Sequence, residues 1–136
     1  MNTVFADTWF YVALLRERDQ HHDWVAQFCR EYRGFLITTR WVLAEVANAM
    51  AGSDIREETT AFLRDLENDP QTTIIGGSDD LYHRGLALYA QRPDKTWSLT
   101  DCVSFVVMEE HGIRESLSED RHFAQAGFVP LFTAQS

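Results

Sequence analysis

The sequence predicts an α/β fold in which helices alternate with the strands of a central, mostly parallel sheet. Short apolar runs rich in β-branched and aromatic residues recur along the chain, and longer segments with helical periodicity separate them. Strands joined through helices pair in parallel, because the chain crosses back over the sheet before the next strand begins. The length of 136 residues, 45% of them hydrophobic, suits a single globular domain spanning residues 1–136.

The expected strands are short and mostly apolar. The first ends directly at Asp7, and the third consists of two threonines and two isoleucines. The fourth, which contains a glutamate and two serines, has the weakest β character. In order, the sequence predicts strands at residues 4–6, 35–38, 72–75, 115–118 and 128–131.

Helical patterns fill the intervals, and residues that favour the N-cap position mark where several helices begin. Thr39, Ser78 and Ser98 each stand directly before a helical segment. Ser53 or Asp54 is expected to cap another helix, and glycines follow four of the segments. The predicted helices are residues 8–15, 19–32, 40–50, 55–67, 79–90, 99–110 and 122–126.

Charge and composition limit the classes of function. The net charge of −9 excludes a generic basic surface that binds nucleic acid by neutralising phosphates, but it permits a local site where carboxylates hold a cation. No apolar stretch approaches the roughly 20 residues of a membrane span, and the N-terminus lacks the pattern of a signal peptide. Cys29 and Cys102 are expected to be buried hydrophobic residues in a reducing compartment, so we expect a cytoplasmic protein without membrane contact.

Four acidic residues are candidates for a site, and all but Glu45 stand where a parallel α/β fold places its sites, near the carboxyl ends of strands. Asp7 directly follows the first strand, Asp101 lies in the first turn of a helix, and Asp120 comes just past the fourth strand. Glu45 lies in mid-helix on an apolar stripe, where a charged side chain is costly unless it is paired or binds a metal. The ends of the first and fourth strands are expected to meet beside the helix that begins after Ser98.

Each of these acids also has an ordinary structural explanation. Asp101 stands three residues after Ser98, as in a capping box. Asp7 and Asp120 are suited to capping helices or turns, and Glu45 is suited to pairing with an arginine. The combination of all four is harder to explain in this way than any one of them.

Clustered carboxylates indicate a site for a hard divalent cation. Mg²⁺ and Mn²⁺ prefer oxygen ligands and keep several waters. A bound cation offsets the repulsion among the carboxylates, lowers the pKa of a bound water and stabilises charge on a phosphodiester. The hydroxyls of Thr8, Ser98 and Ser118 are candidates for supporting contacts in such a site.

Over essentially its whole length the chain resembles a PIN domain, and within that group the VapC-type toxins of bacterial toxin–antitoxin pairs. Each motif is weak alone, but the set in this order and spacing is specific. The motifs are the residues around Asp7 (4–8), the helix of Glu45 (41–48), the stretch 98–105 with Asp101, the stretch 118–123 with Asp120, and a D-x-x-H pattern at 19–22.

The resemblance implies a three-layer α/β/α fold with a parallel sheet and a Mg²⁺- or Mn²⁺-dependent endoribonuclease. Asp7, Glu45, Asp101 and Asp120 match the family's acidic positions, which hold the metal directly or through water. Asp7 and Asp101 are expected to be direct ligands, while Glu45 and Asp120 act through water or help to activate it. Ser118 matches a Ser/Thr position of the family motif, and Asn48 stands one helical turn from Glu45. Trp9 departs from the family, many members of which carry a small or polar residue there.

The resemblance also implies partners: an RNA substrate, a cognate antitoxin protein and a second copy of the chain in a homodimer. Aromatic residues of the first two helices, such as Trp9 and Trp24, are expected either to form partner surfaces or to belong to the core. Arg40, Arg114 and Arg121 lie near predicted strand ends and are candidates for RNA phosphate contacts, with simple solvation as the alternative.

Other readings of the sequence remain open. His21 and His22 are adjacent and cannot both face one point from a helix, whereas His122 is close to Asp120 and is a candidate neighbour of the site. A phosphotransfer or receiver-like domain would also use an aspartate after its first strand, but it would need further groups near Asp7. The alternative of another class is a non-catalytic PIN-like interaction module that binds a basic partner through its acidic cluster.

Overall fold

A computed structural model describes residues 2–119 and 121–133. Within them, five parallel strands form one sheet in the order β3-β2-β1-β4-β5. The strands are β1 (Thr3–Ala6), β2 (Phe35–Thr39), β3 (Thr72–Ile75), β4 (Glu115–Leu117) and β5 (Val129–Pro130). The predicted parallel α/β fold is thereby confirmed.

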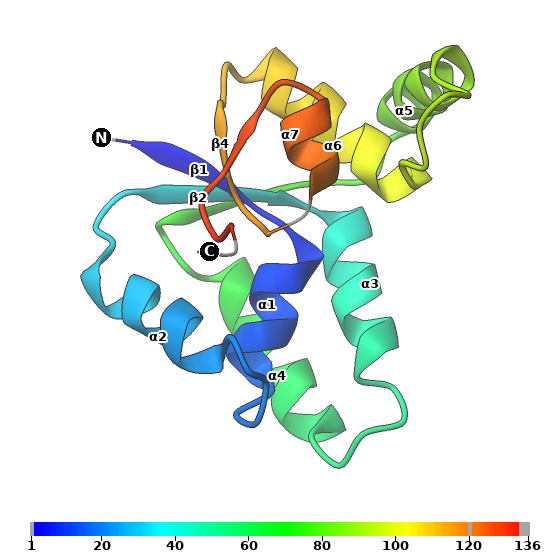
Figure 1. Cartoon of the computed structure of the whole chain (residues 1–136). Coiled ribbons are helices and arrows are strands. Elements are labelled where there is room, and N and C mark those ends of the chain that lie inside the picture. Colours follow the sequence, from blue (N-terminus) through cyan, green and yellow to red (C-terminus); the bar gives the residue numbers. More distant parts are fainter. Residues whose placement is uncertain (1, 120, 134–136) are drawn as a thin grey trace.

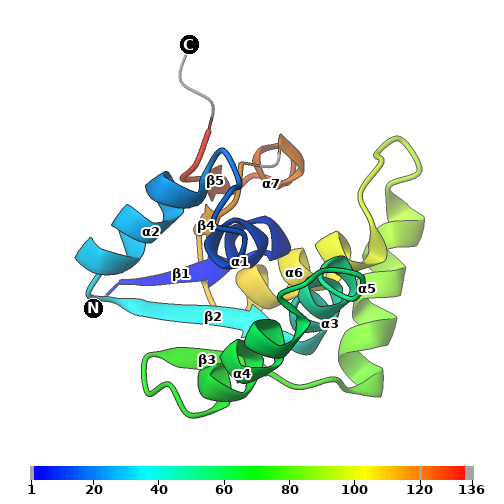
Figure 2. The same ribbon diagram turned by 90° about the horizontal axis from the view of Figure 1, so that it is seen from below.

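Helices cover both faces of the sheet (Figures 1 and 2), which gives the three layers. Helices α1 to α4 lie on one side, and α6 and α7 lie on the other with α5 packed against α6. Their bounds are α1 (Thr8–Leu15), α2 (His22–Glu31), α3 (Arg40–Ala49), α4 (Arg56–Glu67), α5 (Asp79–Gln91), α6 (Leu99–Glu110) and α7 (Arg121–Gln125). In the described part of the chain, no helix is both long enough and apolar enough to span a bilayer.

The core forms on both faces of β1, the middle strand. Val4, Phe5 and Ala6 are completely buried, as expected of a central parallel strand covered by helices on each side. Phe10 and Tyr11 of α1 are equally buried, so for these two aromatic residues the core interpretation is correct. Gly85 lets α5 approach α6 closely, since a Cβ there would stand 2.5 Å from Val103 Cγ2.

Several local predictions need correction. Helix α2 begins at His22 rather than at residue 19, because the Asp19 carboxylate accepts from the His21 N–H and forms a turn. Neither Ser53 nor Asp54 is the N-cap of α4: that residue is Ile55, whose N–H donates to Ser53 Oγ. Cys102 is buried as expected, but Cys29 is exposed on α2. The last strand is shorter than predicted and spans only Val129–Pro130.

The strand order places a switch point between β1 and β4. From β1 the chain runs toward β2 and β3, whereas from β4 it runs toward β5, so the connections leave the two neighbouring strands in opposite directions. Such a divergence opens a crevice outside the carboxyl ends of the strands, where α/β proteins bind ligands. The register pairs Ala6 with Leu117, so Asp7 and Ser118 both leave the sheet at this point.

Candidate functional site

Asp7 stands at the carboxyl end of β1 and begins α1. Its backbone N–H reaches the Leu117 carbonyl at 3.5 Å, which continues the β1–β4 pairing by one residue. Asp7 is only 7% exposed and occupies the N-cap position of α1, yet its side chain makes no capping hydrogen bond to that helix. The sheet therefore holds a buried carboxyl group at the switch point, and capping does not account for it.

Glu45 is brought to the same edge by a contact with Thr8, the residue after Asp7. Thr8 Oγ1 donates to Glu45 Oε1 at 2.8 Å, which joins α1 to the middle of α3. Glu45 is partly buried, and this bond, rather than an ion pair with arginine, satisfies one of its oxygens. Asn48 lies one turn further along α3 than Glu45 and is exposed to solvent.

Asp101 performs the capping role that its spacing predicts. Ser98 Oγ accepts from the Asp101 N–H at 3.0 Å, and Asp101 Oδ2 accepts from the Ser98 N–H at 3.1 Å, which completes a capping box. The same oxygen, Oδ2, is also 3.1 Å from His122 Nδ1 of α7. The Asp101 side chain is 13% exposed, so two donors from separate elements hold one edge of a largely buried carboxylate.

Ser118 and Cys102 lie next to the acids, and their surroundings do not indicate that either side chain is a metal ligand. Ser118 is fully buried, and its hydroxyl lies 2.9 Å from that of Ser116, which fixes the backbone at the end of β4. Burial, together with the charge of Asp101, raises the pKa of the Cys102 thiol to about 11. The thiol is therefore neutral near pH 7 and does not present a thiolate to a cation.

The fourth acid, Asp120, lies outside the described residues. Among residues 2–119 and 121–133, no group of three or more His, Cys, Asp or Glu side chains is arranged to hold a metal ion. The chemistry of the donors nevertheless fits a hard cation, since Asp7, Glu45 and Asp101 all offer carboxylate oxygens. Mg²⁺ is usually bound through one or two carboxylates with waters and substrate phosphates, rather than in a closed protein cage.

Two contacts near the acids were not evident from the sequence. His21 Nε2 lies 3.4 Å from Glu119 Oε2 and its ring packs 5.2 Å from Trp9, so the loop after β4 is tied to the start of α2. His22 turns the other way, toward the Ala13 carbonyl at 2.9 Å, which confirms that the two histidines face different points. The second contact joins His122 to Asp101, 21 positions apart in the sequence. The sequence indicated it only through the position of His122 close to Asp120.

The arginines considered for phosphate contacts have different environments. Arg40 follows β2 at the same edge as Asp7, but its guanidinium forms an ion pair with Glu67, which raises the pKa of Arg40 and lowers that of Glu67. Arg114 precedes β4 and therefore lies at the opposite edge of the sheet. Arg114 does lie near a strand end, as predicted, but at the amino end of β4, whereas Asp7 lies at the carboxyl end of β1.

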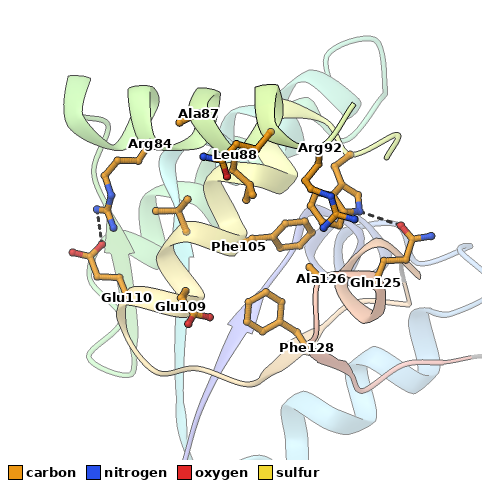
Figure 3. A pocket seen from close by; sticks show the side chains of 13 residues that line it. Arg84, Ala87, Leu88, Arg92, Phe105, Glu109, Glu110, Gln125, Ala126 and Phe128 are labelled. Atoms are coloured by element: carbon orange, nitrogen blue, oxygen red, sulfur yellow. Dashed lines mark hydrogen bonds and ion pairs between the residues drawn. The ribbon is translucent and has the colours of Figure 1, made fainter. Parts of the chain in front are cut away.

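A separate hollow of about 570 Å³ lies between α5, α6 and α7 (Figure 3). Phe105, Leu88 and Phe128 give it an apolar floor, and an ion pair between Arg84 and Glu110 closes one end. At the other end Arg92 lies 5.2 Å over the Trp97 ring. None of the predicted site residues lines the hollow, so the acids of the β1–β4 edge form a distinct surface.

Comparisons with known proteins agree with this architecture. The family model of the PIN domain matches residues 4–129. Among solved structures, VapC20 of Mycobacterium tuberculosis, described as a sarcin–ricin loop cleaving toxin, aligns with a TM-score of 0.86 and 23% identity over 94% of this chain and 98% of that one. FitAcB from Neisseria gonorrhoeae aligns with a TM-score of 0.62 and 17% identity over 96% of each chain. No curated protein matches the sequence significantly.

Proposed function

We propose that this chain, which belongs to the PIN-domain family, is a Mg²⁺- or Mn²⁺-dependent endoribonuclease and the toxin of a toxin–antitoxin pair. The observation that carries the proposal is the group of carboxylates at the carboxyl edge of β1 and β4. Asp7 is buried there, and Thr8 joins Glu45 to the same edge. Asp101, in the first turn of α6, is proposed to complete the group. The structural likeness to VapC20 supports an RNA substrate.

The residues divide the work according to their surroundings. Asp7 and Asp101 are the proposed direct ligands, since both carboxylates are largely buried at the start of a helix. Glu45, fixed by Thr8, and Asp120 are proposed to orient water. A bound Mg²⁺ or Mn²⁺ supplies Lewis-acid stabilisation of the phosphodiester and lowers the pKa of water. The carboxylates repel RNA phosphates when no cation is present, so substrate binding is expected to depend on the metal.

Cleavage of RNA by the purified protein, with Mg²⁺ or Mn²⁺ and with EDTA, tests the nuclease. We expect cleavage only with a divalent cation and its loss in Asp101→Asn, which keeps the size of the side chain and an acceptor oxygen. Asp79→Asn, a change in the exposed first turn of α5, is the matched control and is expected to cleave normally. If Asp101→Asn cleaves as well as the unmodified protein, the assigned site is wrong.

The proposed antitoxin is tested separately from the nuclease. Trp24 of α2 remains 38% exposed, in contrast to the core aromatics of α1, and offers an apolar contact for a partner. Co-expression with the product of a short reading frame immediately upstream, where one is present, is expected to yield a complex that no longer cleaves RNA. A nuclease that is not inhibited by that protein would contradict the toxin–antitoxin assignment while leaving the enzymatic one intact.

The proposed homodimer is supported by the outer face of α5. Tyr82, Leu86 and Tyr89 follow the i, i+4, i+7 spacing of one helix face and are each about 40 to 50% exposed. Sedimentation velocity is expected to give a dimer for the unmodified chain and a monomer for Leu86→Glu. Thr60→Glu, at an exposed position of α4, is the control and is expected to remain dimeric.

The non-catalytic interaction module makes the opposite prediction for metal binding. This alternative keeps the same acids, with Asp7 buried at the carboxyl end of β1, as a binding surface for a basic partner. Calorimetry that detects no Mn²⁺ binding to the unmodified protein would support it. Mn²⁺ binding that Asp7→Asn abolishes would exclude it.

A further inference from the structure

His122 links three segments that meet beside the acids. Its Nδ1 lies 3.1 Å from Asp101 Oδ2 of α6, and its Nε2 lies 3.3 Å from Thr96 Oγ1 in the loop before α6. The ring is 20% exposed, while the carboxylate that it meets is 13% exposed. The contact is therefore a largely buried bond between α6 and α7, and not a chance pairing on the surface.

The hydrogen-bond network assigns the direction of each bond. An ionised carboxylate only accepts, so Nδ1 must carry the proton that it donates to Asp101. In the neutral ring Nε2 then accepts from the Thr96 hydroxyl, and in the charged ring it donates to that oxygen. In either form of the ring, Nδ1 donates to Asp101.

We propose that His122 is a positioning residue that orients the Asp101 carboxylate for the divalent cation, with Thr96 setting the rotation of the His122 ring. This inference rests on the proposed function. Asp101 Oδ2 receives two donors, the Ser98 N–H and His122 Nδ1–H, at 3.1 Å each. Two donors from different directions restrict rotation about the bond to the carboxyl group, which the capping box alone does not. Residues that hydrogen-bond to metal ligands typically change metal affinity by about 10- to 100-fold.

The experiment compares His122→Phe, which keeps a ring but has no donor, with His122→Asn, whose amide can donate from a position close to that of Nδ1. We expect Phe at this position to raise the dissociation constant for Mn²⁺, measured by calorimetry, about tenfold or more. His122→Asn is expected to recover most of that affinity. Thr96→Val should also raise the dissociation constant for Mn²⁺, but by less than His122→Phe does.

Controls separate positioning from folding. His83 of α5 is an exposed histidine bonded to the Asp79 carbonyl of its own helix, so His83→Phe is expected to leave Mn²⁺ affinity unchanged. Melting of the metal-free His122 variants is measured alongside, and at saturating Mn²⁺ the RNA cleavage of His122→Phe is expected to lose kcat with KM unchanged.

The outcomes distinguish this inference from the proposed function. If Asp101→Asn weakens Mn²⁺ binding but His122→Phe binds normally, or His122→Asn is no better than His122→Phe, the positioning role is wrong and the metal site stands. If the unmodified protein binds no Mn²⁺, both proposals are overturned together.

Discussion

The N-termini of α1 and α6 both carry an acid of the candidate site, but they use it differently. At α6, Asp101 closes a capping box with Ser98 and also meets His122. At α1, Asp7 occupies the N-cap position without making a side-chain capping bond. The carboxylate of Asp101 thus stabilises its own helix, while that of Asp7 is buried without this benefit.

This difference shows that a structural role and a functional role are not exclusive alternatives. The capping box of α6 explains why an aspartate stands at position 101, and it also fixes the carboxylate that is proposed to bind the cation. The burial of Asp7 carries an unfavourable desolvation of charge that capping does not offset. Asp7 is therefore the cleaner test of the site, because its substitution should affect chemistry more than folding.

The largest effect is expected from Asp7→Asn. We expect kcat/KM for RNA cleavage to fall at least about 100-fold, the scale of losing one electrostatic group from an active site. The free energy of unfolding should change little, because the Asp7 side chain makes no capping bond to α1 that the substitution would remove and asparagine keeps its size. Urea unfolding and an Mn²⁺-dependent cleavage assay measure the two quantities. An Asp7→Asn protein that unfolds at a lower urea concentration but cleaves RNA normally would show that Asp7, and not Asp101, is the acid with a mainly structural role.

Gly85→Ala perturbs α6 from the face away from the acids. The added Cβ would stand 2.5 Å from Val103 Cγ2, and such overpacking costs about 1 to 3 kcal/mol of unfolding free energy. Mn²⁺ affinity of the folded protein should not change, because the capping box and His122 hold Asp101 independently of this contact. Gly52→Ala, where no atom lies within 4 Å of the new Cβ, is the control. Reduced Mn²⁺ affinity in Gly85→Ala would show that Asp101 is placed mainly by helix packing.

Ser98→Ala and Ser78→Ala form a matched pair of cap deletions. Both serines accept from the backbone N–H three residues on, at 3.0 Å in α6 and 3.1 Å in α5, and each loss should cost about 1 kcal/mol of unfolding free energy. Only Ser98→Ala should also lower Mn²⁺ affinity, because only Ser98 shares its box with an acid of the site. If calorimetry gives the same Mn²⁺ affinity for the two variants, the capping box does not contribute to the function of Asp101.

Features that depend on near neighbours in the sequence were predictable. The spacing of Ser98 and Asp101 predicts the capping box, and Thr39 and Ser78 were correctly identified as caps. The failures at the starts of α2 and α4 have one physical cause. Asp19 and Ser53 bond the N–H two residues on and form turns, so the helix begins later than the first suitable cap residue.

The sequence predicted that the ends of the first and fourth strands meet, and the pairing of β1 with β4 confirms it. The individual side-chain bonds between elements were not predictable, because they depend on how the helices pack around the sheet. The bond of Thr8 to Glu45 spans 37 residues and depends on the packing of α1 against α3, which follow the paired strands β1 and β2. The bond of Asp101 to His122 spans 21 residues and depends on the packing of α6 against α7, on either side of β4 in the chain. Cys29 was assigned to the core on its residue type, although it lies on the solvent side of the amphipathic α2.

The smallest effect is expected from Thr8→Val. This substitution removes the hydroxyl that donates to Glu45 and changes the shape of the side chain little. The lost bond should cost about 1 kcal/mol of unfolding free energy, since Glu45 keeps access to water as a partly buried side chain. Mn²⁺ affinity should fall less than in Asp7→Asn, because Glu45 is proposed to act through water. Thr60→Val in α4, whose hydroxyl bonds the Arg56 carbonyl, is the control and should leave Mn²⁺ affinity unchanged. A loss in Thr8→Val as large as in Asp7→Asn would mean that Glu45 is itself a direct ligand, and that α3 shares the role assigned to the N-termini of α1 and α6.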